Sequence, residues 1–139
     1  MEEIMTDKGL ETHVRGTTLF LDELDKPHNL LCGFVFPSPV AHGIIHEIDV
    51  TEALQCPGVH AILSSKDIPG VNSMGPVAED EPVLAAGKVE YAGQAVLLVA
   101  ADNRACAKKA LKKVKIRIET LPPVLDPEEA FESRDFLFN

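Results

Sequence analysis

Residues 95–120, which read AVLLVAADNRACAKKALKKVKIRIET, decide the fold. The apolar run at 95–101 predicts a strand that is buried on both faces. A strand with one solvent-facing side would alternate apolar and polar residues, and this run does not. Asp102 or Asn103 then caps a helix that we expect to continue to about Lys113. After the helix, apolar and charged residues alternate, which predicts a second strand with one solvent-facing side.

The predicted helix carries one apolar stripe. Its members are spaced at i, i+3, i+4 and i+7, and they are Ala107, Ala110, Leu111 and Val114. Lysines occupy the other side, and two of them fall in the last turn, where the negative end of the helix dipole favours cations. We therefore expect the stripe to pack on a sheet and the lysines to face solvent.

Three more strands are expected upstream, at residues 30–36, 43–50 and 59–63. The first is apolar throughout and is expected to be buried on both faces. The second alternates, so we expect one side to carry the residues Ile44, His46, Ile48 and Val50, and the other Ile45, Glu47 and Asp49. Between the second and third strands, Thr51 is expected to cap a short helix at 52–55.

The remaining elements are short. We expect a brief strand at 89–91, a turn at Gly93-Gln94, and a capped helix at 126–131. The order strand, helix, strand occurs twice, at 44–63 and at 95–119, and each unit is long enough for a right-handed crossover between neighbouring strands. The predicted class is α+β, with a mixed β-sheet, one long helix and one or two short helices.

The chain has the size and composition of a single globular domain. We expect an irregular arm at residues 1–15 and one domain at 16–139. The 22 acidic and 13 basic residues give a net charge of −9, which disfavours binding to nucleic acid or to an anionic membrane. No apolar run reaches the ~20 residues of a membrane span, and residues 1–10 lack the apolar core of a signal peptide. We expect a cytoplasmic protein.

Few residues suggest catalysis or metal binding. The three cysteines stand far apart, without the spacing of a zinc or iron–sulfur site. His42 and His46 are four residues apart, but in a turn and a strand rather than on a helix, so we do not expect them to bind a metal. The acidic run at 79–81 lacks the spaced ligands of a calcium loop. We therefore assign no catalytic, cofactor-binding or metal-binding residue.

A long irregular segment at residues 64–82 stands out, because loops above ~12–15 residues inside a compact domain are uncommon. It also contains part of a series of short motifs that resembles the α/β hammerhead domain of xanthine dehydrogenase and aldehyde oxidase. The motifs are Ser38-Pro39-Val40-Ala41-His42 with Ile45 and Ile48-Asp49, Ala53 with Pro57-Gly58-Val59, Asp67-Ile68-Pro69-Gly70 with Asn72, Glu81-Pro82-Val83-Leu84-Ala85 with Val89 and Gly93-Gln94, and Ala107, Ala110, Val114, Ile116 and Leu121-Pro122. The resemblance covers about residues 16–131. Gly43 departs from it, standing where the family is expected to have Ala.

The resemblance implies that the parent enzyme hydroxylates aromatic heterocycles or aldehydes with oxygen taken from water. It further implies a molybdenum–molybdopterin cofactor, two 2Fe-2S clusters and in some members FAD, all held outside the segment that this chain resembles. The expected partners are the molybdopterin-binding domains or subunit of the same enzyme. In the family the long loop borders the substrate funnel, and by position the funnel or interface residues here would be Met74, Pro76 and Val77. An ordinary surface loop is the alternative for that segment.

Two functions remain open at this point. The first is a non-catalytic structural and interface domain of a molybdenum hydroxylase, present as a fragment or a split subunit. The second is a free-standing acidic binding or adaptor module on the same fold, because a fold does not fix a function.

Overall fold

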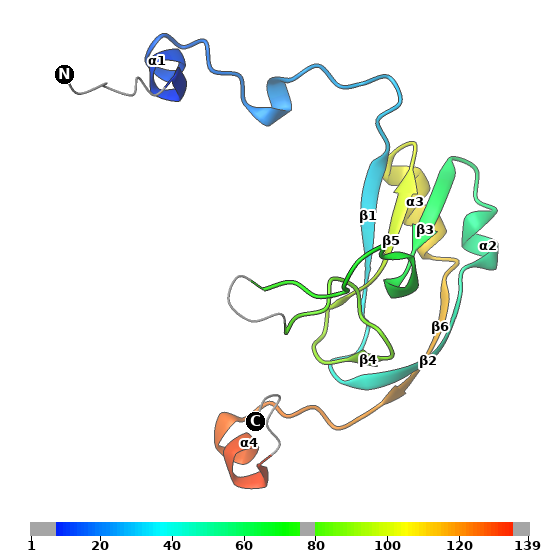
Figure 1. Ribbon diagram of the computed structural model, residues 1–139. Coiled ribbons are helices and arrows are strands. Elements are labelled where there is room, and N and C mark those ends of the chain that lie inside the picture. The colour runs from blue at the N-terminus through cyan, green and yellow to red at the C-terminus, as the bar shows by residue number, and fades with distance from the viewer. Residues whose placement is uncertain (1–7, 76–79, 135–139) are drawn as a thin grey trace. The chain divides into compact units, whose positions relative to one another are not determined.

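Two sheets of three strands each organise the chain from residue 31 onward (Figure 1). In this computed structural model, residues 8–75 and 80–134 are described. The first sheet, sheet A, has the order β1-β5-β3 and is built from β1 (Cys32–Pro37), β5 (Ala95–Ala101) and β3 (Val59–Leu63). The second, sheet B, has the order β4-β2-β6, built from β4 (Lys88–Val89), β2 (Gly43–Asp49) and β6 (Lys115–Thr120).

The chain divides into two compact units, Met1–Leu30 and Leu31–Asn139. The first unit contains the helix α1 (Lys8–Val14) and the 3-10 turn η1 (Leu21–Glu23). The helix lies where the sequence predicts an irregular arm, and an ion pair of 2.7 Å between Glu11 and Arg15, one turn apart, supports it. The domain boundary at residue 16 stays a prediction.

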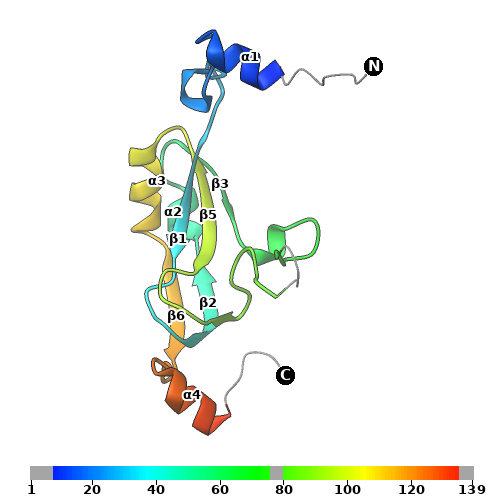
Figure 2. The same cartoon turned by 90° about the vertical axis from the view of Figure 1, so that its left-hand side faces the viewer.

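The described helices of the second unit are α2 (Thr51–Leu54), α3 (Arg104–Leu111) and α4 (Pro127–Ser133), with a 3-10 turn, η2 (Ser65–Asp67), after β3. Helix α3 packs on β1 and β5, and α2 packs on β3 and α3 (Figures 1 and 2). The α+β class predicted from the sequence is confirmed.

The predicted crossover between neighbouring strands is wrong. Every hydrogen-bonded strand pair among the described residues is antiparallel. The unit β2-α2-β3 begins in sheet B and ends in sheet A, and β5-α3-β6 makes the opposite passage. Sequence order gives the length of each connection, but not which sheet receives the second strand.

Two apolar clusters form the core. One joins α2 and α3 to sheet A through small buried side chains, among them Ala53, Ala107 and Ala110. The other lies between the sheets and centres on Val89, Val96 and Leu97, which are at most 1 % exposed. The predicted stripe on α3 is therefore confirmed, with Ala107 and Ala110 fully buried and Leu111 and Val114 packed beside them.

Strand β2 does not alternate as the sequence predicts. Its register against β6 shifts between Ile45 and Glu47, which marks a bulge at His46. A bulge adds one residue to one strand and reverses the facing of the residues beyond it. Ile45 and Ile48 consequently both pack into the core between the sheets, whereas Ile44 is exposed.

Two other local predictions need correction. Strand β1 was expected to be buried on both faces, but its residues alternate between half-buried and exposed, because α3 covers one face only. Thr51 was expected to cap α2; instead it is the first helical residue, and its N–H donates to Asp49 Oδ1 at 2.9 Å. Of the two residues expected to cap α3, Asn103 is the cap, since its side chain accepts from the Cys106 N–H; the Asp126 side chain accepts from Glu128 and Glu129 N–H and caps α4 as expected.

Candidate functional site

The loop after β3 begins with a rigid turn. Asp67 Oδ2 accepts hydrogen bonds from the Ser64 N–H at 2.7 Å and from the Ser64 hydroxyl at 2.8 Å. These two donors, the backbone N–H above all, hold the pKa of Asp67 below its ordinary value. The carboxylate therefore fixes the η2 turn at neutral pH.

The two arms of the loop are held together by one side chain. The Asn72 amide donates to the Leu84 carbonyl at 2.7 Å, and its oxygen accepts from the Leu84 N–H at 3.0 Å. Beyond this clamp, Met74 and Glu81 exchange backbone hydrogen bonds of 2.7 and 3.3 Å. The Asn72 amide thus takes the place of a strand partner and holds together the two ends of the segment 72–84, which we call the excursion.

The predicted funnel residues lie on this excursion. Met74 is 53 % exposed, and it takes part in the bridge to Glu81 through its backbone. Pro76 and Val77 lie outside the described residues. Their role as funnel or interface residues stays a prediction. The Tyr91 hydroxyl donates to Glu81 Oε1 at 3.3 Å, which ties the excursion to the turn after β4.

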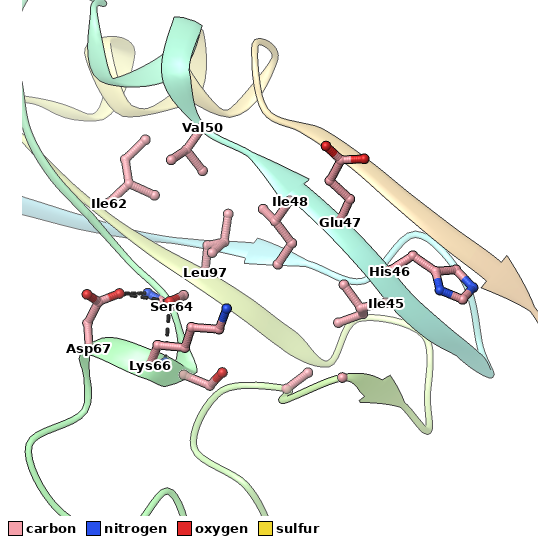
Figure 3. A pocket seen from close by; sticks show the side chains of 13 residues that line it. Ile45, His46, Glu47, Ile48, Val50, Ile62, Ser64, Lys66, Asp67 and Leu97 are labelled. Atoms are coloured by element: carbon pink, nitrogen blue, oxygen red, sulfur yellow. Dashed lines mark hydrogen bonds between the residues drawn. The ribbon is translucent and has the colours of Figure 1, made fainter.

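A cleft of about 540 Å³ opens beside the loop (Figure 3). Its floor is apolar and is formed by the side chains of Ile45, Ile48, Val50, Ile62 and Leu97. The bulge in β2 makes this floor, because it brings Ile45 and Ile48 to the same side. Lys66 of η2 lies at the rim, and His46 also borders the cleft, although its ring points to the other side of β2 (Figure 3).

The rim does not assemble an acid–base pair. Asp67 is already hydrogen-bonded to Ser64, and the His46 ring nitrogen Nε2 lies 2.8 Å from Glu119 Oε2. The apolar floor of the cleft is therefore better suited to binding an apolar side chain than to catalysing a reaction.

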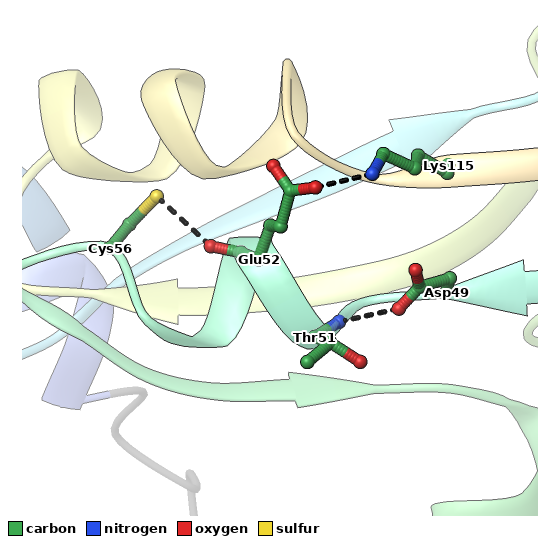
Figure 4. Close-up of polar contacts among 5 residues, drawn as sticks. All are labelled: Asp49, Thr51, Glu52, Cys56 and Lys115. Carbon is green, nitrogen blue, oxygen red and sulfur yellow. Dashed lines mark hydrogen bonds and ion pairs between the residues drawn. The ribbon is translucent and has the colours of Figure 1, made fainter.

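A second group of polar contacts joins α2 to β6 (Figure 4). Glu52 Oε1 and Lys115 Nζ form an ion pair, and Asp49 accepts from Thr51 as described above. The hydrogen bond and charge of Lys115 lower the pKa of Glu52, and the same pair raises the pKa of Lys115. Both side chains are more than half exposed, so we interpret the pair as a surface contact that orients α2 rather than as a catalytic group.

The histidines have separate partners. His42 Nδ1 lies 2.8 Å from the Pro122 carbonyl, and His60 Nε2 lies 2.6 Å from Asp102 Oδ1. Over the described part of the chain, no group of three His, Cys, Asp or Glu side chains could hold a metal ion. The expectation that this chain binds no metal and no cofactor stays a prediction.

Sequence reasoning missed several of these residues. The Asn72 clamp and the His60–Asp102 contact both join residues far apart in the chain. An Asn within a Pro- and Gly-rich loop is a signal for side-chain to backbone hydrogen bonding, but it does not identify the partner.

Within residues 8–75 and 80–134, no helix is long and apolar enough to cross a membrane.

Comparisons with known proteins agree with this fold. Residues 15–122 match the family described as "Aldehyde oxidase and xanthine dehydrogenase, a/b hammerhead domain". A xanthine dehydrogenase of Oryza sativa is 41 % identical over 123 residues, 88 % of this chain and 9 % of that protein. Aldehyde oxidase 4 of Mus musculus is 37 % identical over 135 residues, 96 % of this chain and 10 % of that protein.

Solved structures give the same result. An aldehyde oxidoreductase from Desulfovibrio gigas superimposes with a TM-score of 0.68 at 34 % identity, over 80 % of this chain and 14 % of that one. A CO dehydrogenase from Oligotropha carboxidovorans gives a TM-score of 0.75 at 32 % identity, over 86 % of this chain and 15 % of that one. This chain spans about a tenth of the length of the curated relatives above. It belongs to the aldehyde oxidase and xanthine dehydrogenase family, in which it corresponds to the a/b hammerhead domain.

Proposed function

We propose that this chain is a structural and interface domain of a molybdenum hydroxylase, and that it catalyses no reaction alone. The whole enzyme would oxidise an aromatic heterocycle or an aldehyde with oxygen from water, in the cytoplasm. The contribution of this domain would be to pack against the domains that hold the cofactor and to shape the access of substrate.

The observation that carries the proposal is the family match over residues 15–122 within relatives about ten times as long. The geometry of the loop supports it. The Asn72 clamp and the Met74–Glu81 bridge hold the two ends of the excursion together. A surface that packs against a neighbouring domain would need such a fixed base. Met74, which is 53 % exposed, would be one of the side chains that a partner domain contacts there.

The cofactors expected of the parent enzyme do not fit the described residues. The cleft beside β2 has an apolar floor, Asp67 and Ser64 at its rim are hydrogen-bonded to each other, and His46 contacts Glu119. A 2Fe-2S cluster usually takes four cysteines, and this chain has three. We therefore place molybdopterin, the iron–sulfur clusters and any FAD in the other domains or subunits, which supply the redox chemistry.

The proposal is tested by transplanting this chain into the Oryza sativa xanthine dehydrogenase in place of the segment that it matches. The control is the same enzyme with its own segment returned through identical junctions. We expect the chimera to retain molybdenum and to oxidise xanthine, whereas the enzyme lacking the segment should do neither. Metal content is measured by mass spectrometry and turnover by absorbance.

Two results would contradict the proposal. One is a chimera that folds but contains no more molybdenum than the deletion. The other is the isolated 139-residue chain binding molybdopterin and oxidising hypoxanthine or an aldehyde by itself.

A further inference from the structure

Sheet A is covered by helices on one face only. Its strands are in register, so that Phe34, Val99 and Ile62 form one row across β1, β5 and β3. All three belong to, or pack against, the cluster that contains the buried alanines of α2 and α3. Figure 2 shows α3 on one side of β1 and β5. Both helices thus lie over the face that this row defines.

The adjacent rows point to the opposite face, because side chains alternate along a strand. One row is Val35, Leu98 and Leu63, and the next is Gly33, Ala100 and Ala61. We call these six residues the bare face of sheet A. Val35 is 43 % exposed and Leu63 38 % exposed, and neither takes part in either core cluster.

The bare face of sheet A carries no charge. The protein has a net charge of −9 and 25 % charged residues, yet none of the six side chains is charged or can form a hydrogen bond. An uncharged apolar area on a sheet is typical of a surface that another element covers.

Its shape indicates what fits. The outer strands β1 and β3 lie about 10 Å apart, two strand spacings, and a helix with its side chains is also about 10 Å wide. The row of Val35, Leu98 and Leu63 forms a ridge, and the row of Gly33, Ala61 and Ala100 forms a shallow trough beside it. A Cβ added to Gly33 would contact only Leu98 Cδ1, at 3.8 Å, so the trough is open above the glycine.

We propose that the bare face of sheet A docks an apolar helix face contributed by the remainder of the molybdenum hydroxylase. The sheet then becomes the middle layer between that helix and α3. The occupant is assigned to the same enzyme because this chain matches only 9–10 % of the length of its curated relatives, and the rest of such an enzyme would supply the helix. The inference rests on the proposed function and adds the surface through which the domain is held.

The test compares single lysine substitutions in two settings. Val35→Lys and Leu63→Lys place a charge on the bare face, and Val124→Lys is the matched control, since Val124 is 45 % exposed against 43 % for Val35. In the isolated chain, Val35→Lys should lower the thermal midpoint no more than Val124→Lys does. In the chimera, both bare-face variants should reduce the yield of molybdenum-containing enzyme about tenfold or more, because a buried unpaired charge is strongly unfavourable. Val35→Ile should retain the yield.

The outcomes separate the two proposals. A chimera that folds with the unaltered segment but contains no more molybdenum than the deletion contradicts the proposed function. A chimera that works, and whose Val35→Lys and Leu63→Lys forms match Val124→Lys in yield, overturns the docking inference alone. Sedimentation of the isolated chain tests whether a second copy of this chain occupies the bare face. A dimer that Val35→Lys dissociates would assign the face to that second copy and would also overturn the inference.

Discussion

The substitution Gly43→Ala tests how closely β2 and β6 approach. An ideal Cβ at Gly43 would lie 2.6 Å from the Glu119 carbonyl oxygen and 2.7 Å from Ile118 Cγ2. Both distances are shorter than real Cβ contacts, and the oxygen belongs to the backbone of the paired strand, so β6 must move by about half an ångström. Overpacking of this kind costs about 1–3 kcal/mol.

A smaller opposing effect is expected from the unfolded state. Alanine loses less backbone entropy than glycine on folding, which returns about 0.5–1 kcal/mol. The net loss of stability is therefore about 1–2 kcal/mol, or a fall of roughly 3–8 °C in the thermal midpoint of a domain of this size. Circular dichroism during heating and urea titration of the 139-residue chain would both measure it.

Gly33→Ala provides the matched control, because Gly33 is also a strand residue with open space where a Cβ would stand. We expect it to be neutral or slightly stabilising. If the Gly43→Ala protein proved as stable as the wild type, the inference that β2 and β6 leave no room for a Cβ at residue 43 would be wrong. The result matters for the family, because the resemblance places Ala at this position, and a relative with Ala would need a wider spacing there.

Three further predictions concern polar contacts. Asn72→Ala should destabilise the domain by about 1–3 kcal/mol in urea titration, because it leaves the part-buried N–H and C=O of Leu84 without partners; unchanged stability would contradict the clamp. Asp126→Ala should remove the cap of α4 at a cost of about 1 kcal/mol to that helix, seen as lost helical ellipticity, and Asp126→Asn should retain it. Glu52 has a lowered pKa, so its pair with Lys115 favours folding above the ordinary value of 4.5 and loses that effect as the pH falls through the lowered value. Glu52→Gln should consequently flatten the decline of the urea midpoint in that acid range, and an identical pH profile would refute this role.

The elements that depend on local sequence could be predicted well. The run at 95–101 coincides with β5, and the Asn103 and Asp126 caps begin α3 and α4 as expected. Such features are decided within a few residues, by apolar periodicity and by side chains that reach the adjacent backbone.

What could not be predicted depends on partners distant in the chain. The bulge at His46 arises from pairing with β6, some seventy residues later, and it reverses the facing of half of β2. The exposed side of β1 follows from α3 covering only the other side. In the site, the motif containing Asn72 was noted from the sequence, but its hydrogen bonds to Leu84 became evident only in the fold.

The passage of the chain between the sheets affects how the domain comes apart. Because β2 and β3 belong to different sheets, as do β5 and β6, neither sheet can detach without pulling on a strand of the other. Val89, Leu97 and Ile116, from both sheets, also share one buried cluster. Amide hydrogens of sheets A and B should therefore exchange with deuterium together, through a single opening of the whole fold.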